Sequence, residues 1–391
     1  MPFDLNQARG VLDDIDRQML TLFEKRMETA AAIARYKEQH ALAILDQTRE
    51  EELLKRARTA VQPKLASYAA LFQSQLLALS KALQHETLGD SAPGTQAMAR
   101  LARSASCERQ PHSRPRVIVQ GAPGTYAHEA ALTMYPQADV TFVKHLSDVF
   151  ESVQRGTGDY GMLPVENASA GSASDVFDLL RRYQFYIVRA AQPTVRYCLL
   201  GVRGSKLQTI QKVCSIPIAF QQCADFLALH SDWQQLASSN TASAAAHVAL
   251  TRDSTIAALC SRRCADLYGL DILAEGIQQS ETNRTRFISI AHQFERPADA
   301  NKISVLFNLP HQSGSLCQIL TYFSNYGMNL TKIESRPNPI NLAEYIFYVD
   351  FIGYLGNSRT VELLGALADE CPNFRFLGNY YDPSVATETK A

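Results

Sequence analysis

The segment RMETAAAIARYK, residues 26–37, shows how the N-terminal part of the chain folds. Arg26 and Lys37 are eleven residues apart, about three helical turns, so a helix places both cations on one face within about 20° of each other. Between them that face is small or apolar, with Ala30 and Ile33. Cations on a face suited to burial need an anionic partner. The pattern therefore predicts a pocket for an anion, and the simpler alternative is a solvated basic face.

Around this segment, residues 4–86 have the pattern of an all-helical domain, because their apolar positions recur at spacings of three and four. The first helix would run for more than about thirty residues, which is long for a lone globular domain and favours an intertwined helical oligomer. Arg9 lies about 100° around that helix from Arg26, so we expect Arg9 to serve a second copy of the site. Two further helices are expected, one capped by Asp46 or Thr48 and one opened by Pro63.

The composition argues against several classes of protein. The chain has 391 residues, enough for two or three domains with ample core. Its 38 basic and 39 acidic residues balance, so neither nucleic acid nor a membrane surface is expected as a partner. We find no leader pattern and no apolar run long enough for a bilayer, and expect a cytoplasmic protein. The eight cysteines contain no C-x-x-C pair and are expected to be reduced, mostly buried thiols.

The pattern changes twice after the helical part. Residues 88–114 are rich in small residues, proline and scattered arginines, which indicates a tether with at most one helical turn. A nucleic-acid arm is the alternative, but no aromatic residue interleaves with the arginines. Strands and helices then alternate as in an α/β region of two lobes. The last part has the β-α-β-β-α-β order of the ferredoxin-like fold.

The sequence therefore predicts a multidomain chain. Its expected parts are an all-α domain (1–87), a tether (88–114), a two-lobed α/β domain (115–296), a ferredoxin-like α+β domain (300–382) and a tail (383–391).

Three turns of the α/β region carry polar residues. GAPGTY (121–126) lies between a strand and a helix, where glycines let backbone N–H groups approach an anion; a tight structural turn is the alternative. VENASAG (165–171) places a carboxylate, an amide and a hydroxyl at the end of a strand, where α/β ligands bind. NRTRF (283–287) supplies a hydroxyl in Thr285 and a guanidinium in Arg286. We expect the three turns to converge on one anionic ligand.

Taken together, these segments resemble the bifunctional P-protein family, in which an AroQ-type chorismate mutase is joined to a prephenate dehydratase. The resemblance covers nearly the whole chain outside the tether and the last residues. It is carried by the basic helix positions, by the three turns, and by AFQQC (219–223), LYGL (267–270), SGSL (313–316) and NLTKIESRP (329–337). It implies a domain-swapped helical dimer, a dehydratase domain like periplasmic binding proteins, and a C-terminal ACT domain.

For the mutase, the resemblance implies a rearrangement of chorismate to prephenate without covalent catalysis. Fixed cations would hold the two carboxylates, and donors would stabilise the charge that grows on the breaking ether oxygen. Arg26 and the partner subunit's Arg9 would hold the carboxylates. The other implied catalytic residues are Lys37 and Gln84 at the ether oxygen, Arg49 in an assisting role, Glu50 and Asp46 at the hydroxyl, and Ser80 on the face of Gln84.

For the dehydratase, the resemblance implies loss of water and CO₂ from prephenate to give phenylpyruvate. Thr285 would donate the proton and Arg286 would hold a carboxylate. The same cleft would be lined by Glu166, Asn167, Ser215 and Gln222, with Thr125, Tyr126, Ser169, Gly171 and Phe287 in contact with substrate. Neither reaction needs a metal or another cofactor, and none is expected.

The C-terminal part is expected to bind L-phenylalanine as a feedback inhibitor between paired subunits, in a homodimer or a dimer of dimers. The alternative is a structural dimerisation unit without ligand. The residues implied are Gly314, Ser315, Leu316, Asn329, Leu330, Glu334, Ser335 and Arg336.

One departure from the family pattern leaves two other functions open. Ser215-Ile-Pro-Ile218 stands where the family usually has Ser-His-Pro-Gln. If the two isoleucines weaken the dehydratase, the chain would be a phenylalanine sensor with an active mutase. A third possibility is a mutase joined to a receptor for another small anion.

Overall fold

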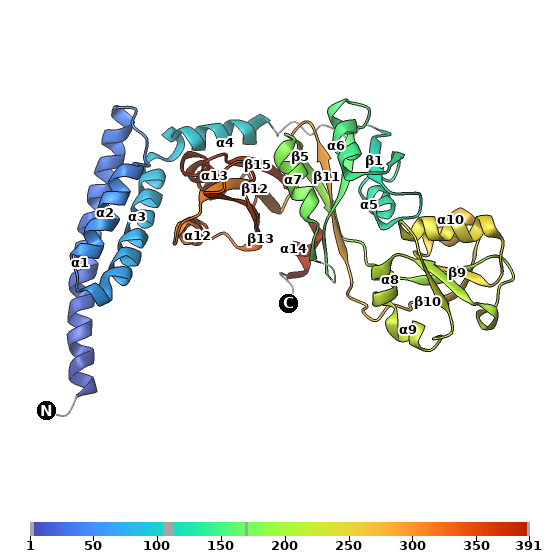
Figure 1. Cartoon of the computed structure of the whole chain (residues 1–391). Helices are drawn as coiled ribbons and strands as arrows, with labels where there is room; N and C mark the ends of the chain where they lie inside the picture. The colour runs from blue at the N-terminus through green and yellow to red at the C-terminus, as the bar shows by residue number, and fades with distance from the viewer. Residues whose placement is uncertain (1–3, 105–112, 169–170, 389–391) are drawn as a thin grey trace. The chain divides into compact units, whose positions relative to one another are not determined.

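The computed structural model describes residues 4–104, 113–168 and 171–388. The chain divides into two compact units, one of Met1–Cys107 with Ile303–Phe376 and one of Glu108–Lys302 with Leu377–Ala391. Figure 1 shows the order of the elements along the chain. Among the described residues, no helix is long and apolar enough to cross a bilayer. Seven cysteines lie in this part of the chain as free thiols, and all of them except Cys317 are buried.

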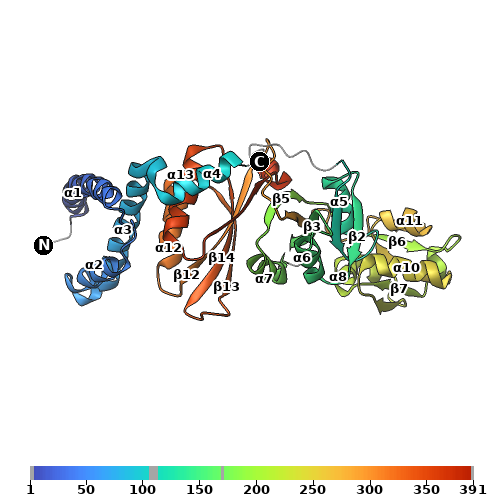
Figure 2. The same cartoon turned by 90° about the horizontal axis from the view of Figure 1, so that it is seen from above.

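The first unit begins with three long helices: α1 (Leu5–Gln39), α2 (Gln47–Thr59) and α3 (Ala66–Leu88), the last preceded by the short helix η1 (Pro63–Leu65). The side chain of Asp4 caps α1 by accepting from the N–H of Asn6 at 2.9 Å. Asp46 caps α2 by accepting from the N–H of Arg49 at 3.0 Å, as predicted. Both α1 and α2 pack against α3 (Figures 1 and 2). The expected long first helix is confirmed by the 35 residues of α1.

The part of the expected tether that the structure describes is more ordered than the sequence indicated. A short turn, η2 (Gly89–Ser91), leads into the 12-residue helix α4 (Pro93–Ser104), where one helical turn was expected. This helix packs along α13 (Ser358–Glu370), as both Figures 1 and 2 show. Gly94 and Gly365 lie where the two helices meet, and neither leaves room for a Cβ.

The C-terminal part of the chain, most of which belongs to the first unit, has the predicted β-α-β-β-α-β order. Its elements are β12 (Lys302–Pro310), α12 (Ser315–Asn325), β13 (Leu330–Pro337), β14 (Glu344–Ile352), α13 and β15 (Arg375–Tyr380). The strand order is β13-β14-β12-β15, which is the ferredoxin-like topology. Helix α12 packs against α3, so this part and the helical part form one compact unit.

The second unit contains two sheets, as expected for two lobes. The first sheet has the order β2-β1-β3-β11-β5 with β4 beside β3, and the second has the order β10-β6-β9-β7-β8. The strands of the first are β1 (Arg116–Gln120), β2 (Asp139–Val143), β3 (Tyr160–Asn167), β4 (Gly171–Ser172), β5 (Tyr186–Ala191) and β11 (Thr285–Ala291). Those of the second are β6 (Cys198–Gly201), β7 (Lys212–Ser215), β8 (Gln234–Ala237), β9 (Ile256–Cys260) and β10 (Asp271–Glu275).

Helices flank these two sheets. They are α5 (Tyr126–Met134), α6 (Leu146–Gln154), α7 (Ser174–Arg182), α8 (Pro217–Gln222), α9 (Ala224–Ala228), α10 (Thr241–Thr251), α11 (Arg263–Tyr268) and the terminal α14 (Pro383–Glu388), with a short η3 (Leu207–Thr209).

Two crossing segments join the lobes. The chain leaves the first lobe after β5 and returns to it through β11. The segments lie side by side, because the N–H of Val195 donates to the carbonyl of Asn283 at 2.8 Å and that of Thr285 donates to Pro193 at 3.3 Å. Thr285 is the first residue of β11, so the polar turn NRTRF lies where the lobes are joined.

Replacing Gly365 with Ala should destabilise the first unit, although Ala is the better helix former by about 1 kcal/mol. The added Cβ would lie 2.5 Å from the backbone N of Thr95 in α4, and such overpacking costs about 1–3 kcal/mol. Thermal unfolding followed by circular dichroism measures the effect as a lower melting temperature. Gly10→Ala in α1 is the matched control, because nothing lies within 4 Å of its added Cβ, and it should not lower the melting temperature. Equal stability of Gly365→Ala and the wild type would contradict the close packing of α4 on α13.

Candidate active sites

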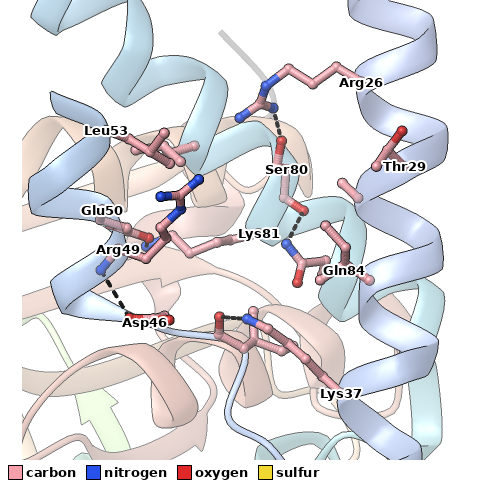
Figure 3. A pocket seen from close by; sticks show the side chains of 14 residues that line it. Arg26, Thr29, Lys37, Asp46, Arg49, Glu50, Leu53, Ser80, Lys81 and Gln84 are labelled. Carbon is pink, nitrogen blue, oxygen red and sulfur yellow. Dashed lines mark hydrogen bonds and ion pairs between the residues drawn. The ribbon is translucent and has the colours of Figure 1, made fainter. Parts of the chain in front are cut away.

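A cavity of about 440 Å³ opens between the three long helices. Figure 3 shows side chains from α1, α2 and α3 around it. It is lined by Arg26, Thr29, Ala30, Ile33, Lys37, Ile44, Asp46, Arg49, Glu50, Leu53, Leu77, Ser80, Lys81 and Gln84. The structure therefore brings together the mutase residues predicted from one subunit.

Arg26 and Lys37 both line this cavity, so the alternative of a solvated basic face is wrong. Arg26 donates to the carbonyl of Leu76 at 2.9 Å and to the hydroxyl of Ser80. Lys37 donates to the carbonyl of Ile44 at 2.5 Å. Burial lowers the pKa of the Arg26 guanidinium. It also lowers the pKa of Lys37, against the opposing effect of Asp46 and other nearby carboxylates.

Two further residues form the floor of the cavity on α3. The amide of Gln84 donates from Nε2 to the carbonyl of Ser80 at 3.3 Å. Within the described residues its Oε1 is buried without a hydrogen-bond partner. Ser80 donates to the carbonyl of Leu76 at 2.8 Å while it accepts from Arg26. A side-chain amide with one unused acceptor is a group that a ligand can satisfy.

Some residues at α2 make contacts within the helix, and one contacts α3 at the cavity wall. Asp46 caps the helix, and Arg49 forms an ion pair with Glu52 at 3.0 Å. Glu50 points to Lys81, whose Nζ lies 3.0 Å from Oε1 of the carboxylate.

Arg9 does not line this cavity. It lies on the exposed first half of α1, which extends beyond α2 and α3 (Figure 1). That Arg9 serves a different copy of the site stays a prediction.

Sequence reasoning missed Lys81, a buried wall of the cavity with 7% of its surface exposed. Its Nζ lies between Glu50 and Glu370 of α13, 2.6 Å from the latter. Burial alone would lower the pKa of Lys81, but the two carboxylates outweigh it and raise the pKa above the usual value. No local pattern signals this residue, because its partners are far away in the sequence.

In the second unit, Thr285 and Asn167 meet through the pairing of β11 with β3. The register places Thr285 opposite Asn167. The amide Nδ2 of Asn167 lies 2.8 Å from Thr285 Oγ1 and 3.2 Å from Asn283 Oδ1. Glu166 precedes Asn167 on β3, and Gly171 of β4 pairs with Asn167. The structure thus joins the VENASAG and NRTRF turns, as predicted.

The second lobe contributes Gln222, at the end of α8. Its Oε1 accepts a hydrogen bond from the hydroxyl of Tyr197 at 3.0 Å. Tyr126 packs against the cores of both lobes and donates to the carbonyl of Arg196 at 2.5 Å. Burial raises the pKa of the Tyr126 and Tyr197 hydroxyls, so both are neutral donors near pH 7.

Three predicted dehydratase residues face elsewhere. Ser215 is fully buried and donates to the carbonyl of Leu259 at 2.7 Å. Phe287 is 4% exposed and belongs to the core of the first lobe. Arg286 is 3% exposed, so its predicted role of gripping a substrate carboxylate is wrong. Successive residues of a strand point to opposite faces, and Arg286 therefore points away from the side where Thr285 meets Asn167.

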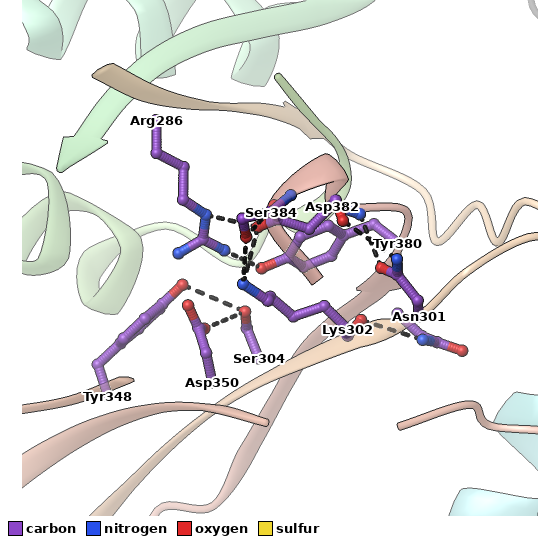
Figure 4. A network of polar contacts seen from close by, with 10 residues as sticks. Arg286, Asn301, Lys302, Ser304, Tyr348, Asp350, Tyr380, Asp382 and Ser384 are labelled. Carbon is purple, nitrogen blue, oxygen red and sulfur yellow. Dashed lines mark hydrogen bonds and ion pairs between the residues drawn. The ribbon is translucent and has the colours of Figure 1, made fainter. Parts of the chain in front are cut away.

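Arg286 instead binds the end of the chain (Figure 4). Its Nε lies 2.7 Å from Asp382 Oδ2, and its Nη2 donates to the hydroxyl of Tyr380 at 2.6 Å. Lys302 also contacts Asp382, at 3.0 Å. Burial would raise the pKa of Asp382, but the two cations and the hydrogen bonds from Ser384 outweigh it and hold the pKa below the usual value.

The GAPGTY turn is a tight contact between the lobes, in agreement with the structural alternative. The hydroxyls of Ser261 and Tyr268 donate to the carbonyls of Gly124 and Pro123, each at 2.8 Å. A Cβ on Gly124 would lie 2.7 Å from the sulfur of Cys264. Thr125 caps α5 by accepting from the N–H of His128 at 3.4 Å. Ser169 lies outside the described residues.

The predicted regulatory residues occupy two places in the ferredoxin-like part. Gly314, with φ of +94°, precedes Ser315 and Leu316 in the first turn of α12. Asn329, Leu330, Glu334, Ser335 and Arg336 lie just before or on β13, which is an edge strand of its sheet. An edge strand presents unpaired backbone groups and can add a partner strand.

Known proteins have domains similar to both parts of this chain. The family model described as prephenate dehydratase matches residues 117–295, and the one described as chorismate mutase type II matches residues 8–85. An arogenate dehydratase/prephenate dehydratase of Arabidopsis thaliana is 34% identical over 68% of this chain and 72% of that protein. The chain belongs to the prephenate dehydratase family. With its mutase domain, this family member is a bifunctional enzyme of phenylalanine biosynthesis with both activities.

Two other proteins extend this relationship. The bifunctional chorismate mutase/prephenate dehydratase of Escherichia coli is 29% identical over 96% of both chains. The structure of a prephenate dehydratase from Arthrobacter aurescens in complex with L-Phe is 29% identical, with a TM-score of 0.63 over 69% of this chain and 90% of that one.

Replacing Asp382 with Asn should destabilise the second unit near pH 7, because it leaves Arg286 and Lys302 buried without their carboxylate. Breaking a buried ion pair in this way costs about 3–5 kcal/mol. The pKa of Asp382 is lowered in the fold, so its stabilisation is present above the ordinary carboxyl pKa and is lost as the pH falls through the folded value. Melting temperatures of variant and wild type, measured from pH 7 down to pH 3, should therefore differ by a constant amount near neutral pH, and the difference should begin to narrow as the pH falls below the ordinary carboxyl pKa.

Glu275→Gln is the control, because it removes an ion pair with Arg262 whose side chains are both more than half exposed. It should change the melting temperature little at any pH. A difference between Asp382→Asn and wild type that stays constant down to pH 3 would contradict the charged role of Asp382.

Proposed function

We propose that the cavity between α1, α2 and α3 is the chorismate mutase site. Chorismate carries two carboxylates, and Arg26 is placed to bind one of them beside Ser80. Lys37 and Gln84 lie on the cavity wall where they can donate to the ether oxygen as its bond breaks. Because these groups are already fixed by contacts to α3 and to the 40–46 loop, little reorganisation is needed when charge develops. Glu50 and Asp46 accept the hydrogen bond that the substrate hydroxyl donates, and Arg49 has an assisting role.

The mutase site is completed by a second subunit in this proposal. Leu12, Leu20 and Leu22 on α1 are 58–67% exposed, which is unusual for a long amphipathic helix without a partner. A homodimer that exchanges the first half of α1 would bury these residues. It would also deliver the partner subunit's Arg9 to the second carboxylate of the substrate.

We place the dehydratase reaction at Thr285. Asn167 donates to Thr285 Oγ1, so the threonine proton is free to point toward a ligand. It would protonate the departing ring hydroxyl, which leaves as water while the ring carboxylate leaves as CO₂ and the ring becomes aromatic. Solvent then returns one proton to Thr285. Gln222 supplies a further polar contact to the same substrate. Glu166 pairs with Arg286 in the β3–β11 register, so it lies on the face opposite to Thr285 and has no part in this proposal.

The positions of Ser215 and Ile216 favour an active dehydratase over a phenylalanine sensor. Ile216 packs against the core of the second lobe, and Ser215 is buried and donates to the carbonyl of Leu259. The isoleucines therefore replace residues at the base of α8 rather than the groups around Thr285. The free, buried thiols are consistent with the reducing conditions of the cytoplasm.

We assign the ferredoxin-like part as an ACT domain that binds L-phenylalanine. The first turn of α12 offers backbone N–H groups to a carboxylate, and the edge strand β13 with Glu334, Ser335 and Arg336 can pair across a dimer. The related Arthrobacter aurescens structure, which holds L-Phe, supports this ligand. Feedback inhibition requires that phenylalanine bind one state of the enzyme more tightly than the other.

Lys37→Ala should lower the mutase kcat by about 10²-fold or more, because loss of one donor to a developing oxyanion has that effect. The fold should persist, since Lys37 contacts α1–α2 loop backbone rather than a core. Chorismate consumption measures the mutase, and conversion of prephenate to phenylpyruvate by the same sample is the control. Unchanged mutase turnover would refute the assignment of Lys37.

Mixing subunits tests the shared site. Arg9→Ala and Lys37→Ala, each measured alone, should have strongly lowered mutase activity. If the two proteins are unfolded and refolded together, mixed dimers contain one site with both residues intact, so mutase activity should return. No recovery, in a sample shown to contain mixed dimers, would contradict an exchanged Arg9.

Thr285→Val should lower the dehydratase kcat by about 10²–10⁴-fold, because the variant keeps the shape of threonine and loses its proton. Mutase activity on chorismate should remain at the wild-type level. Phenylpyruvate formation from prephenate is measured, with arogenate as a second substrate. Wild-type dehydratase activity in Thr285→Val would contradict Thr285 as the proton donor.

A further inference from the structure

Lys81 links the mutase cavity to the C-terminal domain. It lies on α3 next to Ser80, and its ammonium contacts Glu50 of α2 on one side and Glu370, the last residue of α13, on the other. Figure 3 shows Lys81 beside Glu50 at the wall of the cavity. The side chains of Lys81 and Glu370 are 9% and 3% exposed.

The ammonium of Lys81 is buried and is held by two carboxylates. Its Nζ lies 3.0 Å from Glu50 Oε1 and 2.6 Å from Glu370 Oε2. His85, one turn further along α3, lies 3.5 Å from the other oxygen of Glu370. A buried ammonium with two carboxylate partners is stable only while both contacts persist. The position of the Lys81 ammonium is therefore fixed by Glu50 on one side and by Glu370 on the other.

The contact with Lys81 fixes the orientation of the Glu50 carboxylate. The ion pair with Lys81 uses Oε1, which leaves Oε2 of Glu50 to accept a hydrogen bond within the cavity. Groups that orient a ligand-binding side chain from behind typically change activity about 10–100-fold when they are removed.

We infer that Lys81 is a positioning residue of the mutase reaction, which fixes the Glu50 carboxylate for the substrate hydroxyl, and that Glu370 of the C-terminal domain holds Lys81 in place. The functional mutase site then includes a side chain from outside the helical domain. The inference rests on the proposed role of Glu50, and the experiment separates the two.

Burial and charge agree with this arrangement. Burial would raise the pKa of Glu370, but the contacts with His85 and Lys81 outweigh it and hold the pKa below the usual value. Glu370 therefore remains a carboxylate, and the opposing charges of the network keep Lys81 charged.

The test is a set of variants in the full chain, measured by steady-state mutase kinetics. Lys81→Met should raise the KM for chorismate about tenfold or more with a smaller change in kcat, because a contact to the hydroxyl is made in both ground and transition states. Glu370→Gln should also raise the KM for chorismate, but by a smaller factor than Lys81→Met. Lys81→Arg should recover part of the loss, which a packing defect alone does not explain.

Two double-mutant cycles decide how Lys81 acts. If it acts through Glu50, Lys81→Met should add little to the loss already caused by Glu50→Gln. If Glu370 acts through Lys81, Glu370→Gln should add little in the Lys81→Met background. Losses that multiply in the first cycle would mean that Lys81 binds substrate itself and would overturn the inference. A wild-type mutase in Lys81→Met would overturn it as well.

Controls separate this result from misfolding and from failure of the proposed function. Asp369→Asn changes the neighbouring carboxylate of α13, which contacts the backbone N–H of Gly94 and lies near His85 instead, and it should leave mutase kinetics unchanged. Dehydratase activity reports the integrity of each variant. If Lys81→Met loses that activity too, Lys81→Gln and Glu370→Gln are used in its place. If Glu50→Gln alone has no effect, the role of Glu50 fails and the inference fails with it.

Discussion

The need to compensate buried charge shapes both units of this enzyme. In the helical part, Arg26, Lys37 and Lys81 lie around one cavity, and each is held by carbonyls, a hydroxyl or carboxylates of the protein. An isolated cation cannot be buried without such partners. The contacts still leave the cavity electropositive near Arg26 and Lys37, where a dicarboxylate can bind. The same contacts fix the donors before the substrate arrives.

In the second unit, two consecutive residues of β11 make contacts on opposite faces of the strand. Thr285 meets Asn167, while Arg286 binds Asp382 and Tyr380 near the end of the chain. The alternation of side chains along β11 makes this division unavoidable. Arg286 thus holds the strand that carries Thr285 to Asp382 and Tyr380.

The sequence allowed much of this to be predicted where the signal is local. Helical periodicity placed Arg26 and Lys37 on one face. The capping pattern left Asp46 or Thr48 as the cap of the second helix, and the order of strands and helices predicted the ferredoxin-like fold. Arg286 was misassigned because NRTRF was interpreted as a polar turn, so the alternation of faces along a strand was not applied to Thr285 and Arg286. Ser215 was misassigned because a serine at a strand end has the same pattern whether it faces a cleft or the next strand. Lys81 was missed because Glu50 and Glu370 approach it only in the folded chain.

A crystal structure of the full chain with an unreactive dicarboxylate analogue of chorismate tests this account most directly. We expect one carboxylate at Arg26 and Ser80, the ether position between Lys37 and Gln84, and the hydroxyl on Glu50, with Lys81 still between Glu50 and Glu370. An analogue bound away from these helices would contradict the account. So would a bound analogue that contacts neither Arg26 nor Lys37, with both side chains still on their present carbonyl partners.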